Sequence, residues 1–106
     1  MLEKKYTYTK VDAKKVEKIV DDNNVVINHM TLAKDTGLPV HFSNSNVYMI
    51  IIRGKMSIAL GEQDFHQYEE GEILNIPYNV KMDVRNFFEG ILEFFVVKAP
   101  NPKDMK

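Results

Sequence analysis

The side chains that could carry chemistry in this sequence are few, and the histidines are the clearest of them. The chain has three, His29, His41 and His66, and no cysteine. The lack of cysteine excludes disulfides, thiolate zinc sites and a cysteine nucleophile. Neither His29 nor His66 has metal-ligand spacing to His41, and His66 falls in an expected solvated hairpin. Because an imidazole can donate a hydrogen bond or exchange a proton near neutral pH, His41 is the first candidate site residue.

His41 lies near the start of the stretch Pro39–Gly54, which continues into the most apolar segment of the chain. The residues Ser43–Asn46 that follow it are all small and polar. We expect them to form a solvated loop that satisfies its own backbone, with a polar rim around a ligand as the alternative. His41 then has two interpretations. It is a structural histidine hydrogen-bonded to Ser43 or Asn86, or it is a ligand-binding donor or general acid/base, which would need a second group to orient the ring.

The element that follows His41 is a strand with two apolar faces. One face carries Val47, Met49 and Ile51, and the other carries Tyr48, Ile50 and Ile52. A strand buried on one side only would show polar residues at every second place. The second face must therefore be covered as well, by the N-terminal residues or by another subunit.

Alternating or β-branched runs between turn residues predict strands along the rest of the chain. They cover residues 16–20, 25–33, 55–60, 65–68, 72–76, 81–86 and 91–97, with a further short strand at 5–9. Residues 16–20 also fit a helical stripe, so helix and strand compete there. Many short strands without a long helical pattern indicate an all-β antiparallel sandwich or barrel.

Composition places the chain among single-domain globular proteins: 106 residues, 44% hydrophobic and 27% charged, with a net charge of −1. We expect an N-terminal arm at 1–15, a β-barrel domain at 16–99 and a flexible C-terminal tail at 100–106. No basic stripe exists, so we expect no nucleic-acid partner. No apolar run approaches the ~20 residues of a membrane span, and the N-terminus lacks a signal-peptide segment. We therefore expect no membrane partner and a cytoplasmic location.

Two patterns resemble the metal-binding motifs of the cupin family. In the first motif, two histidines one residue apart precede a glutamate, and a glycine follows. Gly54 fits the glycine, which places Val47 at the glutamate and His41 and Ser43 at the histidines. In the second motif, Gly71, Pro77 and Asn86 match the family's residues. Asn79 occupies the position of a second glycine, where a positive φ is needed, and Met82 occupies the position of the histidine. The resemblance covers about residues 25–99 and implies an all-β, single-domain jelly roll, the double-stranded β-helix barrel.

The positions that depart from these motifs determine whether the resemblance implies a metal site. Cupins of known activity usually hold one divalent metal on histidine and carboxylate side chains. Only His41 remains of that set, because Val47 has no donor atom and the Ser43 hydroxyl is a poor ligand. The thioether of Met82 suits monovalent copper and little else. We therefore expect no metal and no cofactor.

The barrel interior could still hold a small molecule without a metal. Apolar and pliable side chains with a few polar groups are the usual make-up of a pocket. The candidate ligand-binding residues are His41, Ser43, Val47, Met49, Met82 and Asn86. The alternatives are that side chains fill the lumen, that Asn86 stabilises its turn instead, and that a metal binds through residues outside the motifs, such as Glu93 or His29.

The function that these observations favour is that of a non-catalytic, metal-free cupin that binds a small molecule in its barrel. One alternative is a small cupin enzyme, either an isomerase or epimerase or a metal-dependent, oxygenase-like protein, that uses His41 with non-standard ligands. Another is a structural or partner-binding module. Because Phe94–Val97 adds to the apolar surface of the second strand face, we also expect a homodimer that buries that face.

Overall fold

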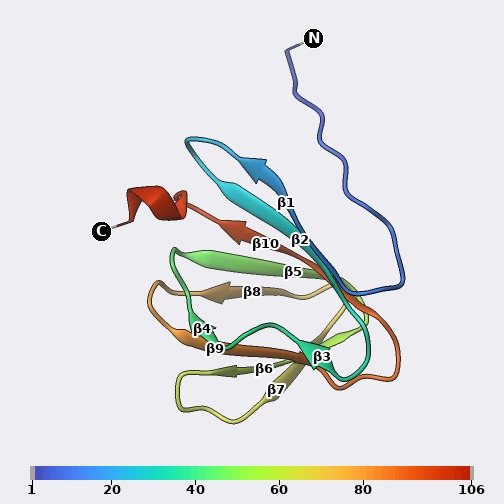
Figure 1. Cartoon of the computed structure of the whole chain (residues 1–106). Helices are drawn as coiled ribbons and strands as arrows, with labels where there is room; N and C mark the ends of the chain where they lie inside the picture. Colours follow the sequence, from blue (N-terminus) through green and yellow to red (C-terminus); the bar gives the residue numbers. More distant parts are fainter. Residues whose placement is uncertain (1, 106) are drawn as a thin grey trace.

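The computed structural model describes residues 2–105, and their regular secondary structure is almost entirely β-strand (Figure 1). The elements are β1 (Lys15–Asp21), β2 (Val26–Leu32), β3 (Thr36–Gly37), β4 (His41–Phe42), β5 (Val47–Arg53), β6 (Lys55–Leu60), β7 (His66–Glu69), β8 (Ile73–Ile76), β9 (Lys81–Asn86), β10 (Leu92–Lys98) and the 3-10 helix η1 (Pro102–Asp104). One sheet has the order β1-β2-β10-β5-β8. The other has the order β3-β9-β6-β7, with β4 also paired to β9. The two antiparallel sheets close on each other as a jelly-roll barrel.

The core lies between the sheets and is built from every second residue of their strands. Val47, Met49 and Ile51 of β5 point inward and are buried, as the alternation predicts. The register with β10 places Phe94 beside Ile51 in the same layer. The remaining buried members come from both sheets: Met30, Leu32, Met56, Ile58, Ile76, Met82, Val84, Leu92 and Val96. One continuous apolar cluster therefore fills the barrel.

Three of the motif positions, Gly54, Gly71 and Asn79, have a positive φ. Gly54, between β5 and β6, has a φ of 83°, and a Cβ there would lie 2.1 Å from the carbonyl oxygen of Ile91. Glycine is required at this position because only it avoids that contact. Asn79 has a φ of 63°, which confirms its expected role in place of a glycine.

The expected strands are confirmed with shifts of at most one residue at their ends, and residues 16–20 belong to a strand, β1. The short strand expected at residues 5–9 is wrong, because that segment has no regular secondary structure and pairs with no strand. Within residues 2–105, no helix has the length and apolar character needed to cross a membrane. The cytoplasmic location and the domain limits stay predictions.

The N-terminal arm, residues 2–14, runs over the outer face of the sheet that contains β1, β2 and β10, and its first part projects away from the barrel (Figure 1). Tyr8 anchors it. The Tyr8 ring lies 4.4 Å from the His29 ring and 5.0 Å from the Phe95 ring, measured between centroids. The arm thus covers part of the outer face, which is one of the two alternatives that the apolar faces of β5 predicted.

The C-terminal segment is anchored through Asn101, where the sequence predicted a flexible tail. The Asn101 side chain is buried and donates to the Asp21 carboxylate (2.8 Å) and to the Asp22 carbonyl (2.7 Å). Its oxygen caps η1 by accepting from the backbone of Lys103. The bond from Asn101 is the main cause that holds the pKa of the Asp21 carboxyl below its usual value.

Candidate functional site

The predicted binding residues inside the barrel contribute to a packed core. Val47, Met49 and Met82 are each at most 3% exposed and belong to the apolar cluster that joins the two sheets. Of the two alternatives for the lumen, filling by side chains is the one that this packing supports. Whether any of these residues contacts a ligand stays a prediction.

His41 lies apart from the polar residues expected to accompany it. Its side chain is exposed on β4, and its Nδ1 atom lies 2.8 Å from the carbonyl oxygen of Pro39. The expected hydrogen bond to Ser43 or Asn86 is therefore wrong. His41 pairs with Met82 near the start of β9, whereas Asn86 ends that strand, about 13 Å further along it. Within the described chain, no carboxylate lies within hydrogen-bond distance of His41.

Ser43 and Ser45 are buried, which corrects the expectation of a solvated loop. The Ser43 hydroxyl donates to the Pro77 carbonyl (2.6 Å) and accepts from the backbone of Val80 (2.8 Å). The Ser45 hydroxyl donates to the Pro100 carbonyl. Both side chains tie neighbouring loops together, so their hydrogen-bonding capacity is largely used within the fold.

Asn86 also stabilises the loops around it, which agrees with the alternative that it stabilises its turn. Its amide donates to the carbonyls of Leu32 and Gly90, each at 2.9 Å. Its side-chain oxygen accepts from the backbone of Phe88 at 2.9 Å. These bonds join the β9–β10 loop to the end of β2 and account for an asparagine at this motif position.

The residues at the family's metal position do not fit a metal. Val47 offers no donor, the Ser43 hydroxyl is committed to the backbone, and His41 bonds to a carbonyl on the exterior. Residues 2–105 contain no group of three or more histidine, aspartate or glutamate side chains placed to share an ion. A divalent ion would lack the ligands that it needs at this position.

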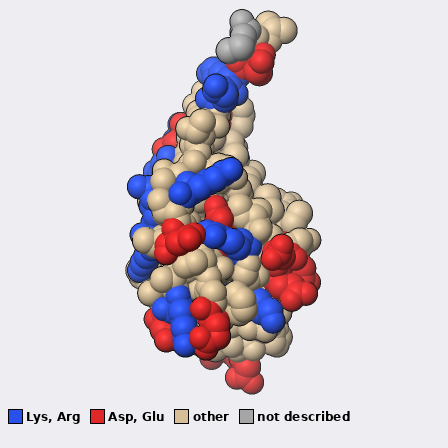
Figure 2. Space-filling model, turned by 90° about the vertical axis from the view of Figure 1, so that its right-hand side faces the viewer, with Lys and Arg blue, Asp and Glu red and all other residues tan. Residues whose placement is uncertain are grey.

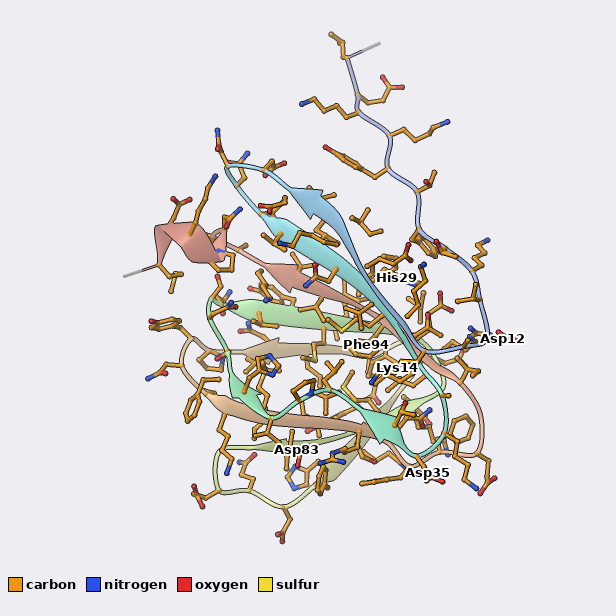
Figure 3. The ribbon with its side chains drawn as sticks, viewed as in Figure 1. Asp12, Lys14, His29, Asp35, Asp83 and Phe94 are labelled. Carbon is orange, nitrogen blue, oxygen red and sulfur yellow. The ribbon has the colours of Figure 1, made fainter. Side chains whose placement is uncertain are left out.

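A cluster of charged side chains lies on the other side of the same sheet, beneath the arm. His29 is fully buried, with Nδ1 3.1 Å from Glu17 Oε1 and Nε2 2.7 Å from Glu93 Oε2. Figure 3 shows His29 on the arm side of the sheet, whereas Phe94 points into the barrel. The neutral ring can donate to one of these carboxylates and the protonated ring to both. Glu93 and His29 do meet, but on the outer face of the sheet, whereas Val47 and Met82 lie in the barrel core.

This cluster holds the arm at two places. At one end, Glu17 accepts from the backbone nitrogen and the hydroxyl of Thr9, at 2.9 and 2.8 Å. These two bonds, with a smaller contribution from His29, hold the pKa of the Glu17 carboxyl below its usual value. At the other end, Arg53 donates to the Asp12 carboxylate (2.9 Å) and to the Val11 carbonyl (3.3 Å). The hydrogen bonds and ion pairs of the cluster together thus connect one part of the arm, across the sheet, to another part of the arm.

Arg53 closes the connection to the buried carboxylate. Its Nε atom lies 3.1 Å from Glu93 Oε1, close enough for an ion pair but without hydrogen-bond geometry. Glu93 is therefore flanked by His29 on one oxygen and Arg53 on the other. Burial of a carboxylate is tolerated only when such partners are present.

A cleft opens beside this cluster, between the arm and the outer face of the sheet. Its volume is about 350 Å³, within the range of small-molecule pockets. Its walls are formed by Tyr8, Lys10, Val11, Asp12, Ile52, Arg53 and Glu93. Figure 2 looks onto the side of the molecule at the right of Figure 1 and shows basic and acidic side chains interleaved there. The cleft therefore offers charges of both signs next to an apolar wall.

From the sequence, Glu93 and His29 are candidates only as metal ligands, and nothing there places them with Arg53. A signal was present, since His29 and Glu93 each interrupt a β-branched or aromatic run. Polar residues inside such runs must find partners if the strand is buried on both faces. The pairing register that joins them could not be derived from the runs themselves.

The fold and its packed barrel define a class of protein, the double-stranded β-helix, and solved structures agree. A cupin superfamily protein of Desulfitobacterium hafniense superimposes with a TM-score of 0.74 at 10% sequence identity, over 89% of this chain and 84% of that one. At such low identity the likeness concerns the fold alone. No family model matches the chain.

A far closer similarity defines the family. An uncharacterized protein of Methanocaldococcus jannaschii is 50% identical over 107 residues, which cover 99% of this chain and 91% of the relative. A crystal structure from the same organism, described as an RmlC-like cupin family protein with a double-stranded beta-helix fold, superimposes with a TM-score of 0.94 at 48% identity, over 97% of this chain and 95% of that one. The chain belongs to the RmlC-like cupin family.

Proposed function

We propose that the protein is a non-catalytic, metal-free cupin that binds a small molecule in the cleft beneath its N-terminal arm. The observation that supports this proposal is the contrast between the two faces of one sheet. The inner face packs into an apolar core, while the outer face borders a cleft of about 350 Å³ with Lys10, Arg53 and Glu93 in its walls. A few oriented polar groups beside apolar side chains are what a small-molecule site requires.

The same contrast makes binding a better proposal than catalysis. His41, the residue that an enzyme of this family would use here, is exposed and bonded to a backbone carbonyl. A general acid or base needs a partner that orients it and a pocket that holds the substrate against it. The cleft lies on the outer face of the other sheet, beside residues of β5 and β10.

A fragment screen followed by two-dimensional amide NMR tests where ligands bind. We expect bound fragments to shift the amide signals of residues 8–12, Ile52, Arg53 and Glu93, because these residues form the walls of the cleft. Ile52→Trp, which would fill the cleft, should abolish the shifts. Met82→Leu in the barrel is the control and should preserve them. Shifts centred on His41, Ser43 and Met82 would instead place the ligand in the barrel and contradict the proposal.

We also propose that the protein is a homodimer that buries the uncovered part of the same outer face. Tyr48, near the start of β5, and Ile73, beside the middle of β5, are 37% and 63% exposed there. Ile50, which pairs with Ile73, is half-buried beside them. Exposed apolar surface of this kind commonly marks a protein interface, and a two-fold interface would match the patch with a second copy of itself.

Size-exclusion chromatography with light scattering at micromolar concentration should give twice the chain mass of 12.3 kDa. Ile73→Asp should shift the protein to the monomer because it places a charge in the buried interface. Phe42→Asp is the matched control, since Phe42 is 58% exposed on the opposite sheet and should leave the dimer intact. A monomer of the unmodified protein at this concentration would refute the homodimer.

A further inference from the structure

We propose that the ligand of the cleft is a small carboxylate with a planar apolar body, and that Asp12 of the arm occupies the carboxylate position when the ligand is absent. This inference rests on the proposed function, because it names the chemical class of the molecule that the cleft binds. It follows from the way in which the charged groups of the cleft are paired.

Arg53 presents its terminal nitrogens to the arm and not to the sheet. One donates to Asp12 Oδ1 at 2.9 Å, and the other donates to the carbonyl oxygen of Val11 at 3.3 Å. Only one Asp12 oxygen is engaged, although a guanidinium fits both oxygens of a carboxylate in parallel. The Asp12 side chain is 80% exposed, so water and ions compete for this contact. A free carboxylate could replace Asp12 and bind more completely.

The other charges of the cleft favour an anion over a cation. Glu93 already has His29 at one oxygen and Arg53 at the other, so it is poorly placed to attract a cation. The Lys10 ammonium, by contrast, has no ion-pair partner among the described residues, although it lines the same cleft. Once Asp12 is displaced, Arg53 and Lys10 together present positive charge to the ligand.

The apolar walls define the rest of the ligand. Ile52 forms one wall, and Tyr8 forms another. The Tyr8 ring is held in place by its contacts with His29 and Phe95, at 4.4 and 5.0 Å between centroids. A fixed aromatic ring and a branched aliphatic side chain suit a flat, apolar body. An aromatic or similarly planar acid therefore matches both the charge and the shape of the cleft.

Three probes of the same size and different charge test this assignment: benzoate, benzamide and benzylamine, each titrated into the full-length protein and followed by amide NMR. We expect benzoate to shift the signals of residues 8–12 and Arg53, and to bind at least about tenfold more tightly than the other two probes. Arg53→Gln should remove this preference. Arg85→Gln should keep it, because Arg85 pairs with Asp83 on the opposite sheet.

Asp12→Asn is the decisive variant, and its exposed position leaves the fold intact. We expect it to tighten benzoate binding about two- to fivefold, because it removes the competing carboxylate from Arg53. Unchanged or weaker binding, or equal affinity for benzamide, would overturn the carboxylate assignment while the cleft remains a binding site. If no probe and no library fragment shifted the signals of the cleft residues, the proposed function would fail as well.

Discussion

Replacing Gly54 with alanine should cost at least about 3 kcal/mol of unfolding free energy, a large part of the ~5–15 kcal/mol that stabilises a typical domain. Gly54 has a φ of 83°, a conformation that costs other residues about 1–3 kcal/mol. The added Cβ would also lie 2.1 Å from the Ile91 carbonyl oxygen and 3.0 Å from the Ile91 carbonyl carbon. Both are backbone atoms at the entry to β10, so no side-chain rotation relieves the contact and the barrel itself must shift.

Gly61→Ala separates the effect of this contact from the effect of the backbone conformation. Gly61 also has a positive φ, 58°, but a Cβ there would have no heavy atom within 4 Å. We expect it to cost only about 1–2 kcal/mol. Urea unfolding of the two variants and the unmodified protein measures the difference. Equal losses would show that the approach of Ile91 to Gly54 does not limit stability.

His29→Ala should lower the unfolding free energy by about 3 kcal/mol and release the arm. Glu93 is only 8% exposed and would lose the imidazole that lies 2.7 Å from its Oε2 atom. Removing one member of a buried charged group is costly because the remaining charge keeps too few partners. The alanine would also leave a gap beneath Tyr8, whose ring rests on the imidazole.

Two measurements separate this network effect from ordinary packing loss. Urea unfolding gives the stability, and amide hydrogen exchange reports on the arm, where Thr9 bonds to Glu17 through its backbone nitrogen. Exchange at Thr9 should accelerate in His29→Ala. His66→Ala is the control, since His66 is exposed on β7 and should change stability by less than about 0.5 kcal/mol. If the two variants were equally stable and Thr9 stayed protected, the role assigned to His29 would be wrong.

The sequence was sufficient to predict the barrel and which side chains of β5 face its core. The alternation in Val47–Arg53 identified Val47, Met49 and Ile51 as one face, and these residues are buried in the core. The turn residues were equally informative, because glycine at 54 and asparagine at 79 both mark a positive φ. Such features depend on neighbouring residues alone, so they can be read from a single sequence.

The charged cluster could not be predicted in the same way, because its members come together only in the folded sheet. Glu17, His29, Arg53 and Glu93 lie on four different strands, and the register of β2 and β5 against β10 decides that they meet. The burial of Ser45 has the same origin, since the Pro100 carbonyl that it bonds lies far along the chain. A small polar residue in a loop gives no local sign of such a partner.

The anchoring of the C-terminal segment by Asn101 has a practical consequence for biosensor design. Asn101 bonds to Asp21 and Asp22 at the end of β1, whereas the arm contacts Glu17, about 13 Å back along that strand. In Figure 1 the C-terminal helix and the bend of the arm lie on opposite sides of the molecule. A surface linkage through the C-terminus would therefore orient immobilised molecules with the cleft turned away from the support and open to analyte.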